Sequence, residues 1–93
     1  KIEKDKLVET EKLFNSIKFL NKQIEIEKEQ VKLTKEKMDI LKQKFIVGVS
    51  NYEKFSKGVK EYLNYLKNLQ QIEKQKSINI GILNILIERE IVE

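Results

Sequence analysis

Apolar residues recur every seven positions along the first half of this chain, and no proline interrupts the pattern. We call one set the first row: Ile17, Ile24, Val31, Met38 and Phe45, with Leu13, Leu20 and Leu41 at the companion position. A seven-residue repeat of this kind is typical of an α-helix that packs along another helix. The pattern therefore predicts one long helix over residues 2–47.

The same segment carries a second apolar set with the same spacing. We call it the second row: Phe19, Ile26, Leu33, Ile40 and Val47. Its offset of two residues from the first row places the two rows roughly 155° apart around a helix of 3.5 residues per turn. Because a single partner helix can cover only one of them, the pattern predicts a helix with a neighbour on each side, like a stave of an α-helical barrel. A bundle helix with some exposed apolar residues is the simpler alternative.

A break in the pattern lies between Lys44 and Glu53. Gly48 can adopt the left-handed conformation that ends a helix. Ser50 and Glu53 have the spacing of a capping box, in which each side chain satisfies a free backbone N–H at the start of the next helix. The sequence thus predicts a turn at 48–50 and a second helix over residues 51–90. The expected fold is all-α: a single long antiparallel helical hairpin, or coiled coil, with two apolar seams. A plain turn without any further role is equally compatible with this pattern.

The second segment repeats with the same period, although less regularly. One apolar set is Tyr52, Val59, Leu66, Ile80 and Ile87; another is Phe55, Tyr62, Leu69 and Leu83, widened by Tyr65, Ile72 and Leu86. Residues 78–87 are apolar on nearly every side, which is typical of a helix covered by neighbours. Their isoleucine content would also suit a β-strand, but the spacing of Leu83, Leu86 and Ile87 favours the helix.

The composition excludes several kinds of chemistry. The chain has no Cys, His, Trp or Pro, which excludes a cysteine or histidine zinc site, a disulfide, a thiol nucleophile and a histidine base. The neighbouring carboxylates Glu25, Glu27 and Glu29 alternate faces on a helix and do not converge, and the glycines are too isolated to form a phosphate-binding loop. We therefore expect no enzyme activity, no cofactor and no metal site.

The charge pattern also limits the partners that we expect. The formal net charge is +4, but the lysines are interspersed with acids, whereas nucleic-acid readers usually have a one-sided basic stripe. We therefore expect no nucleic-acid partner. No uninterrupted apolar stretch is long enough to cross a membrane as a helix. The chain starts without Met, and we interpret it as a piece of a longer protein.

The residues of the break resemble a known motif. Lys44-Phe45-x-x-Gly48-Val49-x-Asn51-Tyr52, followed by Phe55, is similar to the periplasmic tip of outer-membrane efflux proteins of the TolC family. The flanking seven-residue pattern also looks like the helices beside that tip. The sequence departs from the family at Asn51, which replaces a Ser or Thr, at Glu53 and Lys54, and in its lack of alanine.

The resemblance implies a periplasmic hairpin of an outer-membrane duct that is a homotrimer in its full-length form. Its tip would gate export and dock a periplasmic adaptor protein, which connects it indirectly to an inner-membrane transporter. By position, the docking residues would be Val47, Gly48, Val49, Ser50 and Asn51, with Asn51 capping and shaping the turn. Contact with a membrane would come only from parts of the parent protein outside this segment.

Two other functions stay open. One is the α-hairpin of the periplasmic adaptor itself, which also turns at Gly-x-Ser; Asp39 and Gln43, however, stand where adaptors commonly carry Arg and Leu. The other is a structural coiled-coil arm, such as a scaffold spacer or an RNA-binding hairpin. That arm should have one apolar seam and a basic tip, whereas this sequence has two seams and a Val-Gly-Val tip.

Overall fold

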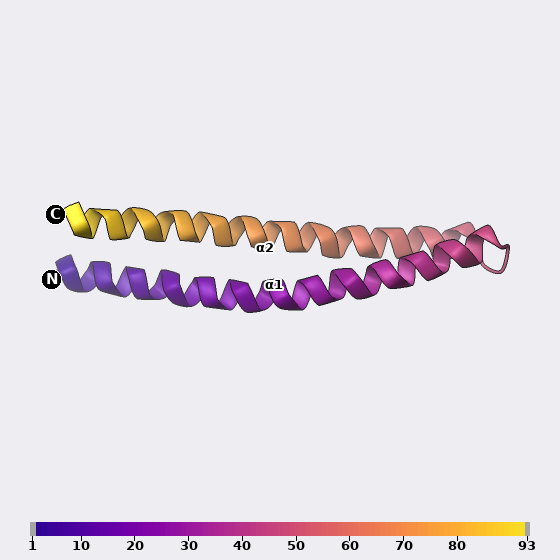
Figure 1. Cartoon of the computed structure of the whole chain (residues 1–93), viewed down its shortest axis with the longest axis horizontal. Helices are drawn as coiled ribbons and strands as arrows, with labels where there is room; N and C mark the ends of the chain where they lie inside the picture. The colour runs from indigo at the N-terminus through magenta and orange to yellow at the C-terminus, as the bar shows by residue number, and fades with distance from the viewer. Residues whose placement is uncertain (1, 93) are drawn as a thin grey trace. The chain divides into compact units, whose positions relative to one another are not determined.

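The computed structural model describes residues 2–92, and side chains from 7 to 89. Helix α1 spans Ile2–Ile46 and helix α2 spans Tyr52–Val92, with residues 47–51 as the connection (Figure 1). The predicted helices differ from these bounds by one or two residues at their ends. Residues 78–87 are helical, so the helix predicted there is confirmed and the β alternative is wrong. No strand occurs between residues 2 and 92.

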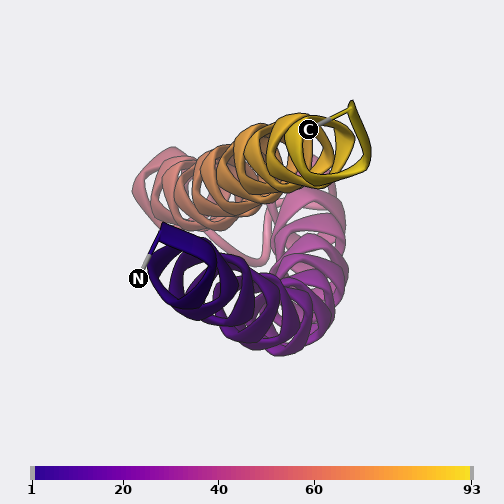
Figure 2. The ribbon, with the colours of Figure 1, turned by 90° about the vertical axis from the view of Figure 1, so that its left-hand side faces the viewer.

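The two helices divide into two compact units. One unit joins α1 up to Ile24 with α2 from Ile72 onward, and the other is the segment Glu25–Gln71, which contains the turn. In each unit a piece of α1 lies beside a piece of α2 that runs in the opposite direction; Figure 2 shows the start of α1 and the end of α2 from their open end. The predicted all-α antiparallel helical hairpin is therefore confirmed.

The first row of α1 faces α2. Ile24 is buried, with 8% of its surface exposed, and Ile17, Val31 and Met38 are half-buried. Phe45, at the end of the helix, is the most open member. The companion positions Leu13, Leu20 and Leu41 are half-buried as well. The first row is thus an inter-helix seam, as its periodicity predicts.

The facing seam of α2 contains all seven residues of the second predicted set of this helix, together with Gly58, Lys76 and Asn79. Its inner positions follow a 3–4 spacing, and all are buried or half-buried: Phe55, Gly58, Tyr62, Tyr65, Leu69, Ile72, Lys76, Asn79, Leu83 and Leu86. Of the other predicted set, Tyr52, Ile80 and Ile87 are exposed, whereas Val59 and Leu66 are half-buried. The second predicted set is therefore confirmed, and the prediction left out Gly58, Lys76 and Asn79 because a search for apolar residues passes over such positions.

Gly58 explains how closely α2 approaches α1 near the turn. A Cβ atom at this position would lie 2.8 Å from Leu41 Cδ1 and 3.8 Å from the backbone Cα of Met38. A glycine inside a helix costs about 1 kcal/mol relative to alanine, and here it makes room for the side chain and the backbone of the other helix. At Gly81, also inside α2, a Cβ atom would meet nothing within 4 Å beyond its own stretch of helix.

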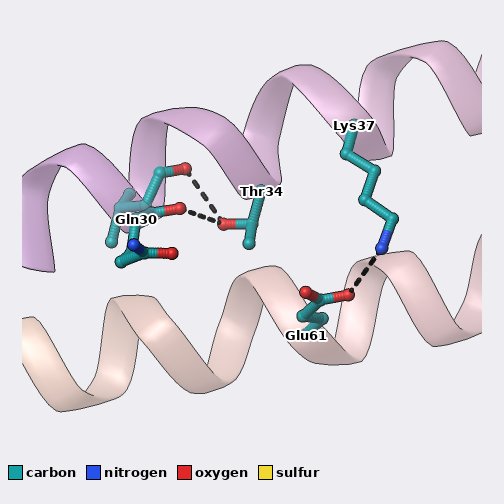
Figure 3. A network of polar contacts seen from close by, with 5 residues as sticks. Gln30, Thr34, Lys37 and Glu61 are labelled. Atoms are coloured by element: carbon teal, nitrogen blue, oxygen red, sulfur yellow. Dashed lines mark hydrogen bonds and ion pairs between the residues drawn. The ribbon is translucent and has the colours of Figure 1, made fainter.

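Two buried polar side chains, Thr34 and Asn79, have hydrogen-bond partners. In the unit that contains the turn, Thr34 Oγ1 donates a hydrogen bond shared between the carbonyl oxygens of Gln30 (2.8 Å) and Val31 (3.1 Å) of its own helix (Figure 3). In the other unit, Asn79 Nδ2 donates to Ser16 Oγ at 3.0 Å, across the two helices, and Gln75 Nε2 donates to Asn79 Oδ1 at 2.9 Å. A buried polar bridge of this kind has to be paired correctly, so it favours a single register of the two helices.

An ion pair joins the helices in the unit that contains the turn. Lys37 Nζ lies 3.2 Å from Glu61 Oε2, and both side chains are well exposed (Figure 3). Exposed pairs of this kind contribute about 0–1 kcal/mol to stability. The apolar seam, and not this pair, therefore holds the two helices together.

The two helical glycines give a matched test of the close approach. We expect Gly81→Ala to raise the free energy of unfolding by up to about 1 kcal/mol, because it adds helix propensity without a clash. Gly58→Ala should gain clearly less, since Leu41 has to move, and Gly58→Phe should be destabilising because the backbone of Met38 blocks the ring. Urea unfolding followed by circular dichroism measures all three; equal gains for the two alanine variants would contradict the close approach.

Candidate functional site: the tip and the second row

The end of α1 is closed by a complete Schellman motif. Gly48 has a φ of 79°, the left-handed conformation in which a side chain is strained. The N–H of Val49 donates to the carbonyl oxygen of Lys44 at 2.8 Å, and the N–H of Gly48 donates to that of Phe45 at 3.1 Å. These two bonds satisfy carbonyl groups that the helix leaves free at its end. The predicted role of Gly48 in ending the helix is confirmed.

The start of α2 is capped by Asn51, as the resemblance implies, and not by the pair of Ser50 and Glu53 that their spacing predicts. Asn51 Oδ1 accepts a hydrogen bond from the backbone N–H of Lys54 at 3.0 Å, the usual bond of an N-cap residue to the third residue of its helix. Ser50 Oγ is buried without a hydrogen-bond partner, and the carboxylate of Glu53 lies 4.0 Å from Lys57 Nζ. The capping box is therefore wrong by one residue, because asparagine is as good a cap as serine and helix α2 begins one residue later than predicted.

An aromatic cluster lies directly behind the turn. The ring of Phe45 stacks on that of Phe55, with centroids 5.7 Å apart, and meets the ring of Tyr52 edge-on at 5.9 Å. Aromatic pairs in these geometries contribute about 0.5–1.5 kcal/mol beyond their buried area. The cluster packs the last turn of α1 against the first turn of α2. It therefore holds both ends of the connecting residues 47–51 in place.

Four apolar side chains project around the turn and form what we call the apex: Ile46, Val47, Val49 and Tyr52. Their exposed fractions are 62%, 67%, 75% and 65%, respectively. Of the predicted docking residues, Val47, Gly48, Val49 and Asn51 are exposed and Ser50 is half-buried. The structure brings all five together at the turn. Apolar groups left this open in a structured turn mark the apex as a candidate binding surface.

Exposed lysines flank the apex on both sides along the chain, a feature that our sequence interpretation missed. Between Asp39 and Glu61 the chain carries five lysines and one acid, Glu53. The net charge of this segment is +4, equal to the formal net charge of the whole chain. We call its lysines the collar: Lys42, Lys44, Lys54, Lys57 and Lys60, all exposed. A count of charge along a sliding window would have found it, whereas the whole-chain balance hides it.

The second row of α1 is the other candidate surface. Phe19, Ile26, Leu33 and Ile40 are 61%, 54%, 48% and 56% exposed, in contrast to the buried Ile24 of the first row. Val47 ends the row and also belongs to the apex. Within each unit the row has no α2 residue to cover it, which agrees with the expectation that a two-helix hairpin leaves these side chains in water. Four members at seven-residue spacing lie in the unit that contains the turn: Ile26, Leu33 and Ile40 on α1, and Val47 at the turn.

The described residues offer little else to a small ligand. No group of three or more metal-ligating side chains occurs among them. An open groove in the unit away from the turn is lined by Leu13, Ile82 and Leu86, with Glu9, Lys12 and Ser16 at its edges. Over the part of the chain that the structure describes, neither helix has a stretch long and apolar enough to cross a membrane.

Comparisons with known proteins identify no relative. No protein-family model matches the chain, and neither a curated protein nor a solved structure matches it significantly.

The two possible caps give a direct test of how α2 begins. We expect Asn51→Ala to lower the free energy of unfolding by about 1 kcal/mol, because the N–H of Lys54 loses its acceptor. Ser50→Ala should leave stability unchanged or raise it, since it removes a buried hydroxyl that has no partner. Thermal unfolding of the two variants beside the wild type measures the difference. A larger loss for Ser50→Ala than for Asn51→Ala would restore the capping box.

Proposed function

We propose that this chain is a structural helical hairpin that packs side by side with further helices through the second row of α1. The observation that carries the proposal is the contrast between the two rows. The first row is covered by α2, whereas Ile26, Leu33 and Ile40 are about half exposed at regular spacing along the same helix. Full burial of each such side chain is worth roughly 1.5–3 kcal/mol. A continuous row therefore gives neighbouring helices a reason to associate.

In its specific form, the proposal places the hairpin in the wall of an α-helical duct of the outer-membrane efflux type. The parent protein would be a homotrimer that exports compounds across the periplasm, with an adaptor protein and an inner-membrane transporter as its partners. The tip motif and the two opposed rows support this form. A coiled-coil arm with one seam would not need the second row, and for this reason we rank it lower.

Lateral packing can be tested on the chain itself. We expect the wild type to self-associate, and the triple variant Ile26→Gln, Leu33→Gln and Ile40→Gln to be monomeric, because glutamine keeps helix propensity but removes the apolar row. Sedimentation equilibrium over a range of protein concentrations measures the difference.

A matched control changes the neighbouring charged row at the same spacing: Glu25→Gln, Lys32→Gln and Asp39→Gln. These three side chains are exposed, and their replacement should leave self-association within a factor of about three, since screened surface charges contribute little. A monomeric wild type, or an equal loss in both triple variants, would refute lateral packing through the second row.

The duct form makes its own prediction at the tip. In a cell whose drug resistance depends on the parent protein, Gly48→Trp should abolish resistance without unfolding the hairpin, because the indole would fill the place of a docked side chain. Gly48→Ala is the control, since both variants bear the strain of a left-handed residue, about 1 kcal/mol, but alanine adds only a methyl group. Unchanged drug resistance in Gly48→Trp would exclude adaptor docking at this position.

A further inference from the structure

The tip combines an exposed apolar apex with nearby exposed lysines. The proposed lateral packing shares only Val47 with the apex, whereas adaptor docking in the duct form would compete for the same tip residues. We infer that the apex inserts into the surface of an anionic lipid bilayer, while the collar binds the phosphate and carboxylate groups of its lipids. This inference goes beyond the proposed function and departs from the expectation that only other parts of the parent protein touch a membrane. All residues that it uses belong to one unit, Glu25–Gln71.

The apex has the chemistry of a membrane-inserting turn. Ile46, Val47 and Val49 are aliphatic and open to solvent at the point where the chain reverses. Tyr52, beside them, is 65% exposed and its ring is held edge-on against Phe45. Tyrosine is favoured at membrane–water interfaces, where its ring meets apolar chains and its hydroxyl meets water. The backbone N–H groups of residues 47–50 donate to carbonyl oxygens at the end of α1, and that of Lys54 donates to Asn51, so these donors keep their partners when the apex enters a lipid surface.

The charges favour an anionic surface. Five lysines and one acid lie between Asp39 and Glu61. That acid, Glu53, faces Lys57 at 4.0 Å, with both side chains more than three-quarters exposed, so their attraction is largely screened. Lys37, outside this segment, is paired with Glu61. The residues outside the segment have a formal net charge of zero, because the segment carries the whole net charge of the chain. A basic cluster beside an apolar anchor is the combination that binds anionic lipids, at about 1 kcal/mol per lysine near the surface.

The spacing of the two features agrees with the depth of a bilayer interface. At 1.5 Å per residue, Lys44 and Lys54 lie roughly 3 Å behind Ile46 and Tyr52 along their helices, and Lys60 roughly 12 Å behind. Apolar faces of interfacial helices enter about 5–10 Å into the boundary between headgroups and acyl chains. When the apex reaches that boundary, the collar is at the level of the headgroups, and flexible lysine stems can adjust the height of each ammonium group.

A bilayer fits the apex better than a protein does. A stable protein interface usually takes about 20–30 residues from each partner, whereas the apex offers four side chains on the convex end of a hairpin. Aliphatic residues such as valine are also rare among the residues that dominate protein binding energy. A lipid surface needs no complementary cavity, and it can bind a small convex site whose charged side chains are mostly positive.

The absence of tryptophan from the chain allows a specific probe. Val49→Trp places a single fluorophore on the apex at a position that is 75% exposed, and Leu33→Trp places one on the second row. We expect Val49→Trp emission to shift to shorter wavelength with vesicles of phosphatidylcholine and phosphatidylserine, and not with pure phosphatidylcholine vesicles. The shift should disappear in about 0.5 M salt, where the Debye length falls to roughly 4–5 Å. Leu33→Trp should show no shift with either vesicle.

Charge variants in the Val49→Trp chain test the collar. Lys44→Gln with Lys54→Gln should weaken vesicle binding about 25-fold, or about five-fold per lysine. Lys28→Gln with Lys35→Gln removes the same charge from exposed positions away from the tip, and should weaken binding by less than about two-fold. Equal losses in the two pairs would overturn the collar. No shift with anionic vesicles at low salt would overturn the inference as a whole and leave a protein as the occupant of the apex.

Lateral packing and lipid binding can fail separately. The triple glutamine variant of the second row keeps the apex and the collar intact, so in the Val49→Trp chain it should bind anionic vesicles with unchanged affinity even when it is monomeric. Loss of vesicle binding in that variant would assign the interaction to the second row and overturn insertion through the apex. A wild type that is monomeric but still binds vesicles would refute the proposed function alone.

Discussion

A pair of helices has only one interface in which to bury apolar side chains, and the rest of this structure follows from that limit. The first row of α1 and the inner positions of α2 occupy the interface, with Ile24 and Leu69 among its most buried members. Every other apolar stripe must then face solvent or a partner. The second row, the apex and the isoleucines on the outside of α2 are all consequences of a sequence that is more apolar than one seam can cover. For this reason we look for function in assembly and in surface binding.

The periodicity of α1 was enough to predict both of its rows and their different surroundings. The two rows are roughly 155° apart by helical geometry alone, and only one of them can meet α2. Seven inner positions of α2 were predicted in the same way, but those of Gly58, Lys76 and Asn79 were not. Their places depend on the approach of α1 and on the hydrogen bond from Asn79 to Ser16, and neither is visible in the hydropathy of α2.

The turn shows a similar division between what a motif predicts and what tertiary structure decides. Gly48 is the only residue in its neighbourhood that takes a left-handed conformation without strain, so the end of α1 was predictable. Ser50 and Asn51 are both good caps, and the choice between them depends on where α2 can begin. The aromatic contacts of Phe45 with Tyr52 and Phe55 join the end of α1 to the start of α2. They occur in the structure in which α2 begins at Tyr52, one residue later than predicted. The lysine collar could have been found from the sequence by a local count of charge.

The turn at Gly48 also decides whether the seam closes within one chain or between two. No proline separates α1 from α2, and the reversal depends on one left-handed glycine and one asparagine cap. If residues 47–51 became helical, the chain would be a single continuous rod, and two such rods in antiparallel alignment could form the same seam contacts twice. Domain-swapped dimers arise in this way when a short hinge is altered. A change that made the turn helical would therefore favour an exchanged dimer over the hairpin, and more so at high protein concentration, by mass action.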